Sequence, residues 1–420
     1  MYALIDCNNF YASCERVFNP KVNYKPIIVL SNNDGWVIAR SNEAKLLGIQ
    51  MGEPAFKIKS IINRFNVYVY STNFALYGDM SNRVMSTIAS FNIDMEIYSI
   101  DEVFLDLSTF KEEDFFMLAY EIKNKIKKWT GIPVSIGIAK TKTLSKAANY
   151  IAKKNNKENI FIINDSNVNS ILNKISLSKI WGIGPKSYIF LRNYNLKTAL
   201  DLKCANLVWI KHYLNISGEK TIKELRGEPC ISMETMCKSK QSISTSRTFG
   251  TMVTDYKELV SSISLYIARC CEKLRSQNSY ANFITVFIHS NKYRVDLNQH
   301  YSSKVIKFRM PTCNAGEMIS SVVPILKTMY KFGYHYKKAG VILSGIIPNN
   351  TIQQNLFESF DNINKTPLLN TIDTINKKMG RDVIRYAVQG YKKNHKLKQQ
   401  KLSPCYTTRW KELLNVRVLL

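Results

Sequence analysis

Two adjacent carboxylates lie between two short β-strand patterns in the first third of the chain. Residues 97–100 and 103–105 are rich in β-branched and aromatic side chains, so each segment predicts a short strand. Asp101 and Glu102 join them without the Gly, Asn or Pro that a tight hairpin usually needs. Neighbouring negative charges repel, and burying them costs free energy unless a cation compensates them. Two interpretations stay open here: a solvated hairpin tip, or a site for a divalent cation such as Mg²⁺.

A third carboxylate near the N-terminus favours the metal site. Residues 2–5 form an apolar run that is typical of a strand buried on both faces, and Asp6 closes this run. Open α/β sheets bind their ligands at the carboxyl ends of strands. Together with Asp101 and Glu102, Asp6 would supply the three carboxylates needed to hold two Mg²⁺ ions around a phosphate.

Composition limits the classes of function. A length of 420 residues suggests several modules, and 45% hydrophobic residues support buried cores. The net charge of +27 implies a polyanionic partner, although charge alone does not distinguish DNA, RNA and a membrane surface. Neither an export signal nor an apolar run of membrane-spanning length is predicted. The nine cysteines contain no CxxC pair, which favours reduced thiols in a cytoplasmic protein and indicates no zinc site.

The motifs together resemble a known family. The Asp6 strand followed by Asn-Phe-Tyr-Ala-Ser, and the sequence Tyr-Ser-Ile-Asp-Glu-Val-Phe-Leu-Asp at 98–106, resemble the catalytic palm of Y-family translesion DNA polymerases. Residues 29–35 and 39–45 are similar to the UmuC branch of that family, and the resemblance covers essentially the whole chain. It implies error-prone, template-directed DNA synthesis in the SOS response to DNA damage, without proofreading. The substrates would be primer–template DNA and deoxyribonucleoside triphosphates.

Fold class and domains follow from the element pattern and this resemblance. The chain is predicted to be an α/β (α+β) multidomain right-hand polymerase, because alternating strands and helices match a ferredoxin-like palm. The expected domains are the palm at 1–20 and 76–165, small fingers at 21–75, a helix-hairpin-helix thumb at 166–232, a β-α-β little finger at 240–347, and a clamp-binding peptide with a UmuC-type tail at 348–420. Helices are expected over 72–91, 115–129, 256–275 and 315–330, and strands over 26–30, 36–39, 134–139, 244–250, 283–289 and 304–310.

The resemblance also implies roles for individual residues. Asp6, Asp101 and Glu102 would hold two Mg²⁺ ions, and the Cys7 carbonyl would complete the shell of one of them. A non-catalytic DNA-bound scaffold that recruits the clamp and accessory proteins is an alternative, but such a scaffold would have no need of all three carboxylates.

Three basic residues are expected to bind the triphosphate. Lys153 matches the palm lysine of the family. Arg40 and Lys45 stand near the start of a predicted helix, whose backbone N–H groups favour an anion. The family pattern places a hydroxyl residue and an arginine in this part of the fingers, where this chain has Ala39 and Lys45. Each of these basic residues could also be an ordinary surface charge.

Tyr11 is expected to select the sugar. By resemblance it occupies the steric-gate position, where a bulky ring leaves no room for a 2′-hydroxyl. The alternative is a core aromatic, and helical spacing gives that role more readily to the neighbouring Phe10, which shares a face with Cys14.

DNA contacts are expected in two places. The sequence Ile-Trp-Gly-Ile-Gly-Pro-Lys at 180–186 is a helix-hairpin-helix signature, in which Gly182, Gly184 and Lys186 would meet a DNA phosphate. In the little finger the candidate phosphate contacts are Arg247, Lys292, Arg294, Lys304 and Arg309.

The tail carries the expected protein contacts. Gln353, Leu356 and Phe357 belong to a short peptide that resembles the sliding-clamp-binding motif of bacterial polymerases. Residues 403–410 resemble the UmuC-specific tail and are expected to dock a UmuD′-like accessory dimer or the RecA filament. A stand-alone DinB-type polymerase is a further alternative, against which the long tail argues.

Overall fold

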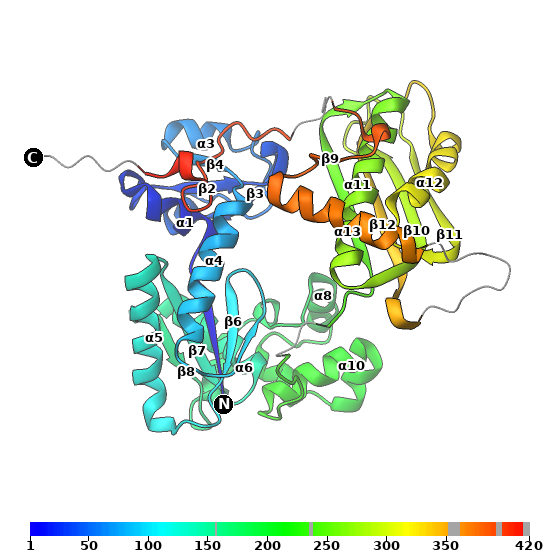
Figure 1. Cartoon of the computed structure of the whole chain (residues 1–420). Helices are drawn as coiled ribbons and strands as arrows, with labels where there is room; N and C mark the ends of the chain where they lie inside the picture. The colour runs from blue at the N-terminus through cyan, green and yellow to red at the C-terminus, as the bar shows by residue number, and fades with distance from the viewer. Residues whose placement is uncertain (156–157, 235–237, 352–361, 392–396, 415–420) are drawn as a thin grey trace, which may run out of the picture. The chain divides into compact units, whose positions relative to one another are not determined.

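The computed structural model describes residues 1–155, 158–234, 238–351, 362–391 and 397–414. The chain divides into two compact units, one made of Met1–Cys237 with Gln399–Leu420 and the other of Lys238–Lys398. Both units combine helices with β-sheets (Figure 1), which confirms the predicted mixed α/β, multidomain class. In the described residues, no helix is both long and apolar enough to cross a membrane.

The first unit is built on a five-stranded sheet in the order β5-β6-β1-β7-β8. Its strands are β1 (Tyr2–Cys7), β5 (Met95–Ile97), β6 (Glu102–Asp106), β7 (Val134–Ala139) and β8 (Ile160–Ile162). β1 pairs antiparallel with both β6 and β7, whereas β7 and β8 are parallel. The first four strands in chain order therefore have the arrangement expected of a ferredoxin-like sheet.

Helices cover both faces of this sheet, which explains why β1 and β7 are buried on both sides. α4 (Phe74–Ala89) and α5 (Phe115–Thr130) share one hydrophobic core with the strands, while α6 (Lys142–Asn155) covers the other face (Figure 1). α6 lies so close to β7 that a Cβ added at Gly137 would meet the backbone N of Asn149 at 2.1 Å. This glycine fixes the distance between the helix and the strand.

A three-stranded sheet in the order β3-β2-β4 forms a second layer of the same unit. It consists of β2 (Ile27–Leu30), β3 (Val37–Arg40) and β4 (Tyr68–Ser71), and it lies beside α1 (Phe10–Phe18), α2 (Asn42–Leu46) and α3 (Lys59–Arg64). The small core of this layer is formed mainly by Ile28, Val37, Ala44 and Ile58.

Four helices complete the globular part of the first unit: α7 (Val168–Lys174), α8 (Pro185–Asn193), α9 (Ala199–Cys204) and α10 (Leu207–Leu225). They pack on one another and on α6 through a core that includes Leu144, Leu172 and Leu191.

Short 3₁₀ helices occur in both units, at Pro20–Val22, Asn32–Asp34, Glu112–Asp114, Leu177–Lys179, Asn349–Thr351, Ala387–Gln389 and Trp410–Glu412.

The second unit contains a four-stranded antiparallel sheet in the order β11-β10-β12-β9. Its elements are β9 (Ile243–Val253), α11 (Tyr256–Ser276), β10 (Ser279–Ser290), β11 (Tyr301–Thr312), α12 (Ala315–Met329) and β12 (Tyr336–Pro348). The helices pack on one face through a single large core. The strand pattern had predicted three of these strands, each too short, and had missed β12.

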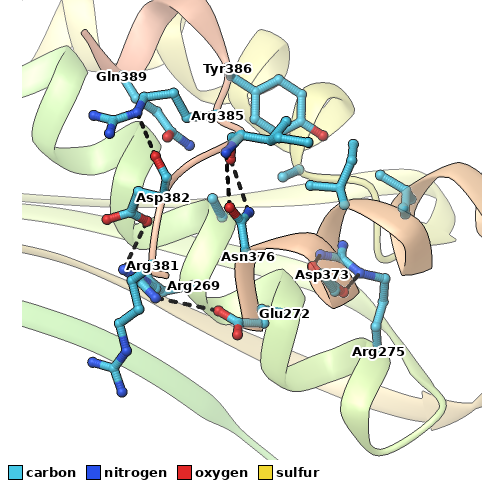
Figure 2. Close-up of a pocket in the computed structure, with 15 residues that line it drawn as sticks. Arg269, Glu272, Arg275, Asp373, Asn376, Arg381, Asp382, Arg385, Tyr386 and Gln389 are labelled. Atoms are coloured by element: carbon cyan, nitrogen blue, oxygen red, sulfur yellow. Dashed lines mark hydrogen bonds and ion pairs between the residues drawn. The ribbon is translucent and has the colours of Figure 1, made fainter. Parts of the chain in front are cut away.

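α13 (Asn362–Met379) and the residues after it pack on this second unit. Figure 2 shows Arg275 of α11 facing Asp373 of α13, with two hydrogen bonds of 2.6 and 2.7 Å between the guanidinium and the carboxylate. Arg269 likewise pairs with Asp382 at 2.8 Å. The bidentate Arg275–Asp373 pair and the single Arg269–Asp382 contact, both partly buried, give the contact a defined register.

The last described residues return to the first unit. The Ser71 amide at the end of β4 donates to the Lys401 carbonyl at 2.8 Å, and Ser403 and Cys405 are buried at 6% and 4% exposure. The Tyr406 ring stacks on Phe18 of α1, with centroids 4.9 Å apart. Half of the stretch expected to dock a partner protein therefore packs against the chain itself, a long-range contact that local sequence patterns do not reveal. Trp410, by contrast, is 89% exposed.

Candidate active site

A serine-capped turn presents the adjacent carboxylates. The expected strand over 97–100 is wrong: β5 ends at Ile97, and the turn residues lead directly into β6. The Ser99 hydroxyl accepts hydrogen bonds from the backbone amides of Asp101 and Glu102 at 3.2 and 3.0 Å. Ser99 thereby supplies the turn chemistry that a Gly or Asn would otherwise supply.

Strand pairing brings the backbone positions of the three predicted carboxylates to the same end of the sheet. Asp6 on β1 lies directly opposite Glu102 on β6, and the Cys7 amide donates to the Asp101 carbonyl at 2.9 Å. Residues opposite each other in an antiparallel pair project from the same face of the sheet. Asp6 and Glu102 therefore face α6.

Two lysines of α6 meet these carboxylates. Lys153 pairs with Asp6 at 2.6 Å and Lys146 pairs with Glu102 at 2.8 Å. The Lys146 ammonium also lies over the rings of Tyr98 and Trp181, at 4.5 and 5.4 Å from their centroids, a cation–π arrangement that fixes its position. The Lys146 ion pair was not predicted, although its seven-residue spacing from Lys153 places both on one helical face.

Two further polar side chains of α6 are buried. Lys142 is only 1% exposed in its side chain, because it pairs with Glu96 and donates to the Ser232 carbonyl. Asn149 is also buried and donates to the Ser135 carbonyl at 2.7 Å. Both side chains serve packing between α6 and its neighbours.

Burial has the largest effect on the electrostatics of Asp6. Burial raises the pKa of Asp6 well above its usual value; Lys153 lowers it, and the nearby Glu102 and Asp101 raise it further. In this arrangement no three acidic, histidine or cysteine side chains of the described residues converge on one point. Each carboxylate instead has its own partner, including the Ser99 hydroxyl that donates to Asp101 at 2.6 Å. The hard oxygen donors suit a divalent cation once those partners move.

Two predicted triphosphate ligands come from the second sheet layer. Lys45 donates to Asn9 at 2.6 Å and to Asn42 at 3.1 Å, and burial lowers its pKa, as do the nearby Arg40 and Lys153. The Arg40 guanidinium donates to the Ile49 carbonyl. Lys45 and Lys153 are thus near each other although they lie 108 residues apart in sequence.

Tyr11 lies at the start of α1 in a half-buried position beside the carboxylates. Its ring stacks on Tyr77 of α4, with centroids 4.4 Å apart and an interplanar angle of 15°. Burial raises its pKa, and so does the charge of the nearby Asp101. Phe10 is buried in the core with Cys14, as the helical spacing predicted.

The predicted helix-hairpin-helix residues precede α8. Gly182 has φ +90°, and a Cβ there would lie 2.8 Å from the Thr221 hydroxyl of α10, so only glycine fits without strain. Gly184 is the residue immediately before α8, with open space around it, and Lys186 is exposed. Backbone N–H groups in the first turn of α8 can donate hydrogen bonds to a bound anion.

The basic candidates of the second unit are exposed but dispersed. The charge of Arg247 lowers the pKa of Tyr266 on α11, although burial raises that pKa overall. Lys304 donates to Thr328 of α12 at 2.8 Å. Both basic residues therefore lie toward the helix-covered side of the sheet. Arg294 pairs with Asp296 at 2.6 Å. Lys292 and Arg309 are exposed.

The strand pattern did not single out the lysines on the other face of that sheet. Lys307 lies opposite Phe283, and Lys338 lies over the Phe287 ring at 5.7 Å.

The clamp-peptide residues Gln353, Leu356 and Phe357 lie outside the described residues.

Family models match three parts of the chain. Residues 5–150 match the impB/mucB/samB family, residues 240–356 match its C-terminal domain, and residues 366–416 match a domain of unknown function, DUF4113.

Curated relatives match over the full length. The chain is 39% identical to Protein UmuC of Salmonella typhimurium, over 99% of this chain and 100% of that protein. It is 37% identical to Protein ImpB of Salmonella typhimurium, over 98% and 99% of the two chains. A DNA polymerase IV of Oceanobacillus iheyensis is 25% identical over 90% of each chain.

Solved structures show the same fold. A Y-family DNA polymerase chimera of Dbh and Dpo4 aligns with a TM-score of 0.67 at 24% identity, over 83% of this chain and 99% of that one. An insertion ternary complex of Dbh DNA polymerase aligns with a TM-score of 0.54 at 24% identity and the same coverage.

These likenesses imply a divalent metal cofactor, with DNA and nucleotides as substrates, and they favour neither the non-catalytic scaffold nor a stand-alone DinB-type enzyme. The chain therefore belongs to the impB/mucB/samB family and is an error-prone, DNA-directed DNA polymerase of the Y family that acts in translesion synthesis and SOS mutagenesis.

Proposed function

We propose that Asp6, Asp101 and Glu102 hold two Mg²⁺ ions, with the Cys7 carbonyl as a further ligand, and that nucleotidyl transfer takes place at this site. The observation that carries the proposal is the register that sets Asp6 opposite Glu102, beside the Asp101–Cys7 backbone hydrogen bond. Bound Mg²⁺ would supply the charge that lowers the pKa of the primer 3′-hydroxyl and neutralises the triphosphate.

The lysines of α6 would change partners when substrates bind. Lys153 is 38% exposed in its side chain, so it can leave Asp6 and reach the triphosphate. Lys146 is held by two aromatic rings and is therefore suited to orient Glu102 throughout the reaction. Lys45 and Arg40 would meet the phosphates from the opposite side. Arg40 and Lys45 are distant from the acidic residues in sequence, but the packing of the two sheet layers brings them near one another.

The domains predicted from the sequence can be assigned to these layers. We place the palm on the five-stranded sheet, the fingers on the three-stranded sheet, the thumb on α7 to α10, and the little finger on the four-stranded sheet. In the thumb, Gly182, Gly184 and Lys186 would bind a DNA phosphate without reading its sequence. In the little finger, Arg247, Lys292, Arg294, Lys304 and Arg309 would contribute phosphate contacts.

The two-ion proposal is tested by a metal titration. With the Mg²⁺–nucleotide complex held constant at a saturating concentration, the extension rate should still rise with free Mg²⁺, because the second ion has to bind separately. A rate that stays constant as free Mg²⁺ is raised from zero would contradict the second ion and leave a single-metal site.

Protein partners would bind through the tail, in the cytoplasm. Gln353, Leu356 and Phe357 would bind the sliding clamp through an apolar pocket. A UmuD′-like dimer or the RecA filament would meet exposed tail residues such as Trp410, rather than the buried Ser403 and Cys405.

Replacing both Leu356 and Phe357 by Ala should abolish stimulation of synthesis by the sliding clamp. Basal extension should stay unchanged, because the peptide lies outside the catalytic domains. The measurement is extension of a primed circular template with and without loaded clamp. The matched control replaces Leu413 and Leu414, two exposed tail residues, and should keep the stimulation. Equal stimulation of all three proteins would show that the peptide does not bind the clamp.

A further inference from the structure

The returning tail reaches residues that lie directly behind the active site. The side-chain amide of Asn73, at the start of α4, donates to the Ser403 carbonyl at 2.9 Å and to the Ser403 hydroxyl at 3.1 Å. The side-chain oxygen Oδ1 of Asn73 meanwhile accepts from the Leu76 amide at 3.2 Å and so caps α4. The tail is thus joined to the first turn of the helix that carries Tyr77.

Ser403 also completes a buried hydrogen-bond chain. Its hydroxyl donates to the Glu15 carboxylate of α1 at 3.0 Å, and the same carboxylate oxygen accepts from the Tyr77 hydroxyl at 2.6 Å. Glu15 is 1% exposed and Tyr77 is fully buried. Burial raises the pKa of Glu15 to about 7, while Tyr77 and Ser403 lower it. An isolated buried carboxyl is costly, so each of these two donors matters to its position.

Tyr77 forms the wall behind Tyr11. The two rings are nearly parallel at 4.4 Å, and Phe74 closes a second side of Tyr11 edge-on at 6.3 Å. A ring that could move aside would let the 2′-hydroxyl fit, and the enzyme would then bind ribonucleotides and deoxyribonucleotides more equally. Sugar discrimination by steric clash therefore requires that the ring be held in place. The Tyr77 ring, and the hydrogen bonds that hold it, therefore affect how strongly ribonucleotides are excluded.

We propose that Ser403 of the tail, acting through Glu15 and Tyr77, positions the Tyr11 ring and thereby sets the discrimination between deoxyribonucleotides and ribonucleotides. This inference rests on the proposed polymerase site and on the role predicted from the sequence for Tyr11 as the sugar-selecting residue. It assigns a task within this chain to part of the segment that matches a domain of unknown function. Ser403, Glu15 and Tyr77 are positioning residues, since none of them would touch the nucleotide.

The test measures single-nucleotide incorporation of dATP and rATP opposite the same template base by the full-length protein. Ser403→Ala removes the donor to Glu15, and Tyr77→Phe removes the other donor while keeping the stacked ring. Each variant should reduce the ratio of kcat/KM for dATP over rATP by about three- to tenfold, the effect of losing one ordinary hydrogen bond. For Ser403→Ala the loss should come from a gain in rATP use. Because the ratio is taken within one preparation, the fraction of folded enzyme cancels.

Ser261→Ala is the matched control. Ser261 also donates to a residue C-terminal to the sheet, the Gln389 carbonyl, but both belong to the second unit, whereas the Glu15 hydrogen-bond chain belongs to the first. This variant should keep the wild-type ratio. A wild-type ratio in Ser403→Ala, or an equal loss in Ser261→Ala, would overturn the inference.

A double-mutant cycle separates this inference from the role of Tyr11. In a Tyr11→Ala background, Ser403→Ala should have no further effect on the ratio, because the positioned ring is gone. If Tyr11→Ala raises rATP use and Ser403→Ala does not, the positioning role fails while Tyr11 keeps its role. If Tyr11→Ala itself leaves the ratio unchanged, the role of Tyr11 fails and the inference fails with it.

Discussion

Asp101→Asn is expected to reduce primer extension by roughly a thousandfold or more, since a metal site supplies several kcal/mol of transition-state stabilisation. The substitution keeps the size of the side chain and its ability to accept the Ser99 hydrogen bond, so the turn should persist. Affinity for primer–template DNA should stay nearly unchanged, because it comes from basic residues and backbone amides elsewhere in the chain. Extension rates and DNA-binding isotherms at one fixed salt concentration measure the two effects separately.

Asp106→Asn provides the matched control for that substitution. Asp106 lies at the other end of β6, opposite Tyr2, and its side chain accepts from the Ser108 amide at 2.9 Å. The control should extend primers at nearly the wild-type rate. Extension by Asp101→Asn at a similar rate would contradict the role of Asp101 as a metal ligand.

Tyr11→Ala should increase incorporation of ribonucleotides relative to deoxyribonucleotides by roughly a hundredfold, because a clash is removed while the contacts of the correct substrate are kept. The ring is half-buried between Tyr77 and Phe74, so its loss opens space at the edge of the core without removing a fully buried side chain. Competition between dATP and rATP at one template position measures the effect.

Tyr24→Ala is the control for this second substitution, since Tyr24 is 89% exposed. It should keep wild-type sugar selection. If Tyr11→Ala keeps it too, the ring belongs to the core alone, and Phe10 becomes the next residue to test.

Elements with strong local patterns were predictable from the sequence. The fully buried run Val134–Ala139 is β7 within its predicted bounds, and the four-residue spacing of Leu76, Met80, Val84 and Ile88 is the buried face of α4. In each segment the local pattern of apolar residues is enough to identify the element, without knowledge of distant contacts.

Features that depend on distant contacts were not predictable. The register of Asp6 with Glu102 requires the pairing of β1 with β6, about 100 residues apart in sequence. The burial of Lys142 depends on Glu96 and Ser232, and the burial of Ser403 depends on Glu15 and Asn73. In each case a polar side chain is satisfied by a partner that only the folded chain supplies.

The turn at Ser99 is a local feature that the strand pattern missed. β-branched and aromatic residues extend through Ile100, which suggested a strand, but a single hydroxyl that accepts from two amides is enough to stabilise a turn there. The resemblance to the polymerase family predicted the three carboxylates as a group, and this remains a prediction. Their immediate partners, Lys146 and Lys153, became clear only from the folded structure.

The most direct test of the account is primer extension by the purified full-length protein on two templates that differ by one abasic site. The reaction is run with each deoxyribonucleotide separately, with and without UmuD′ and RecA. We expect Mg²⁺-dependent addition that follows the template base on the undamaged strand, addition opposite the abasic site, and no shortening of the primer. Binding of both templates without addition under any of these conditions would contradict the account and favour a non-catalytic scaffold.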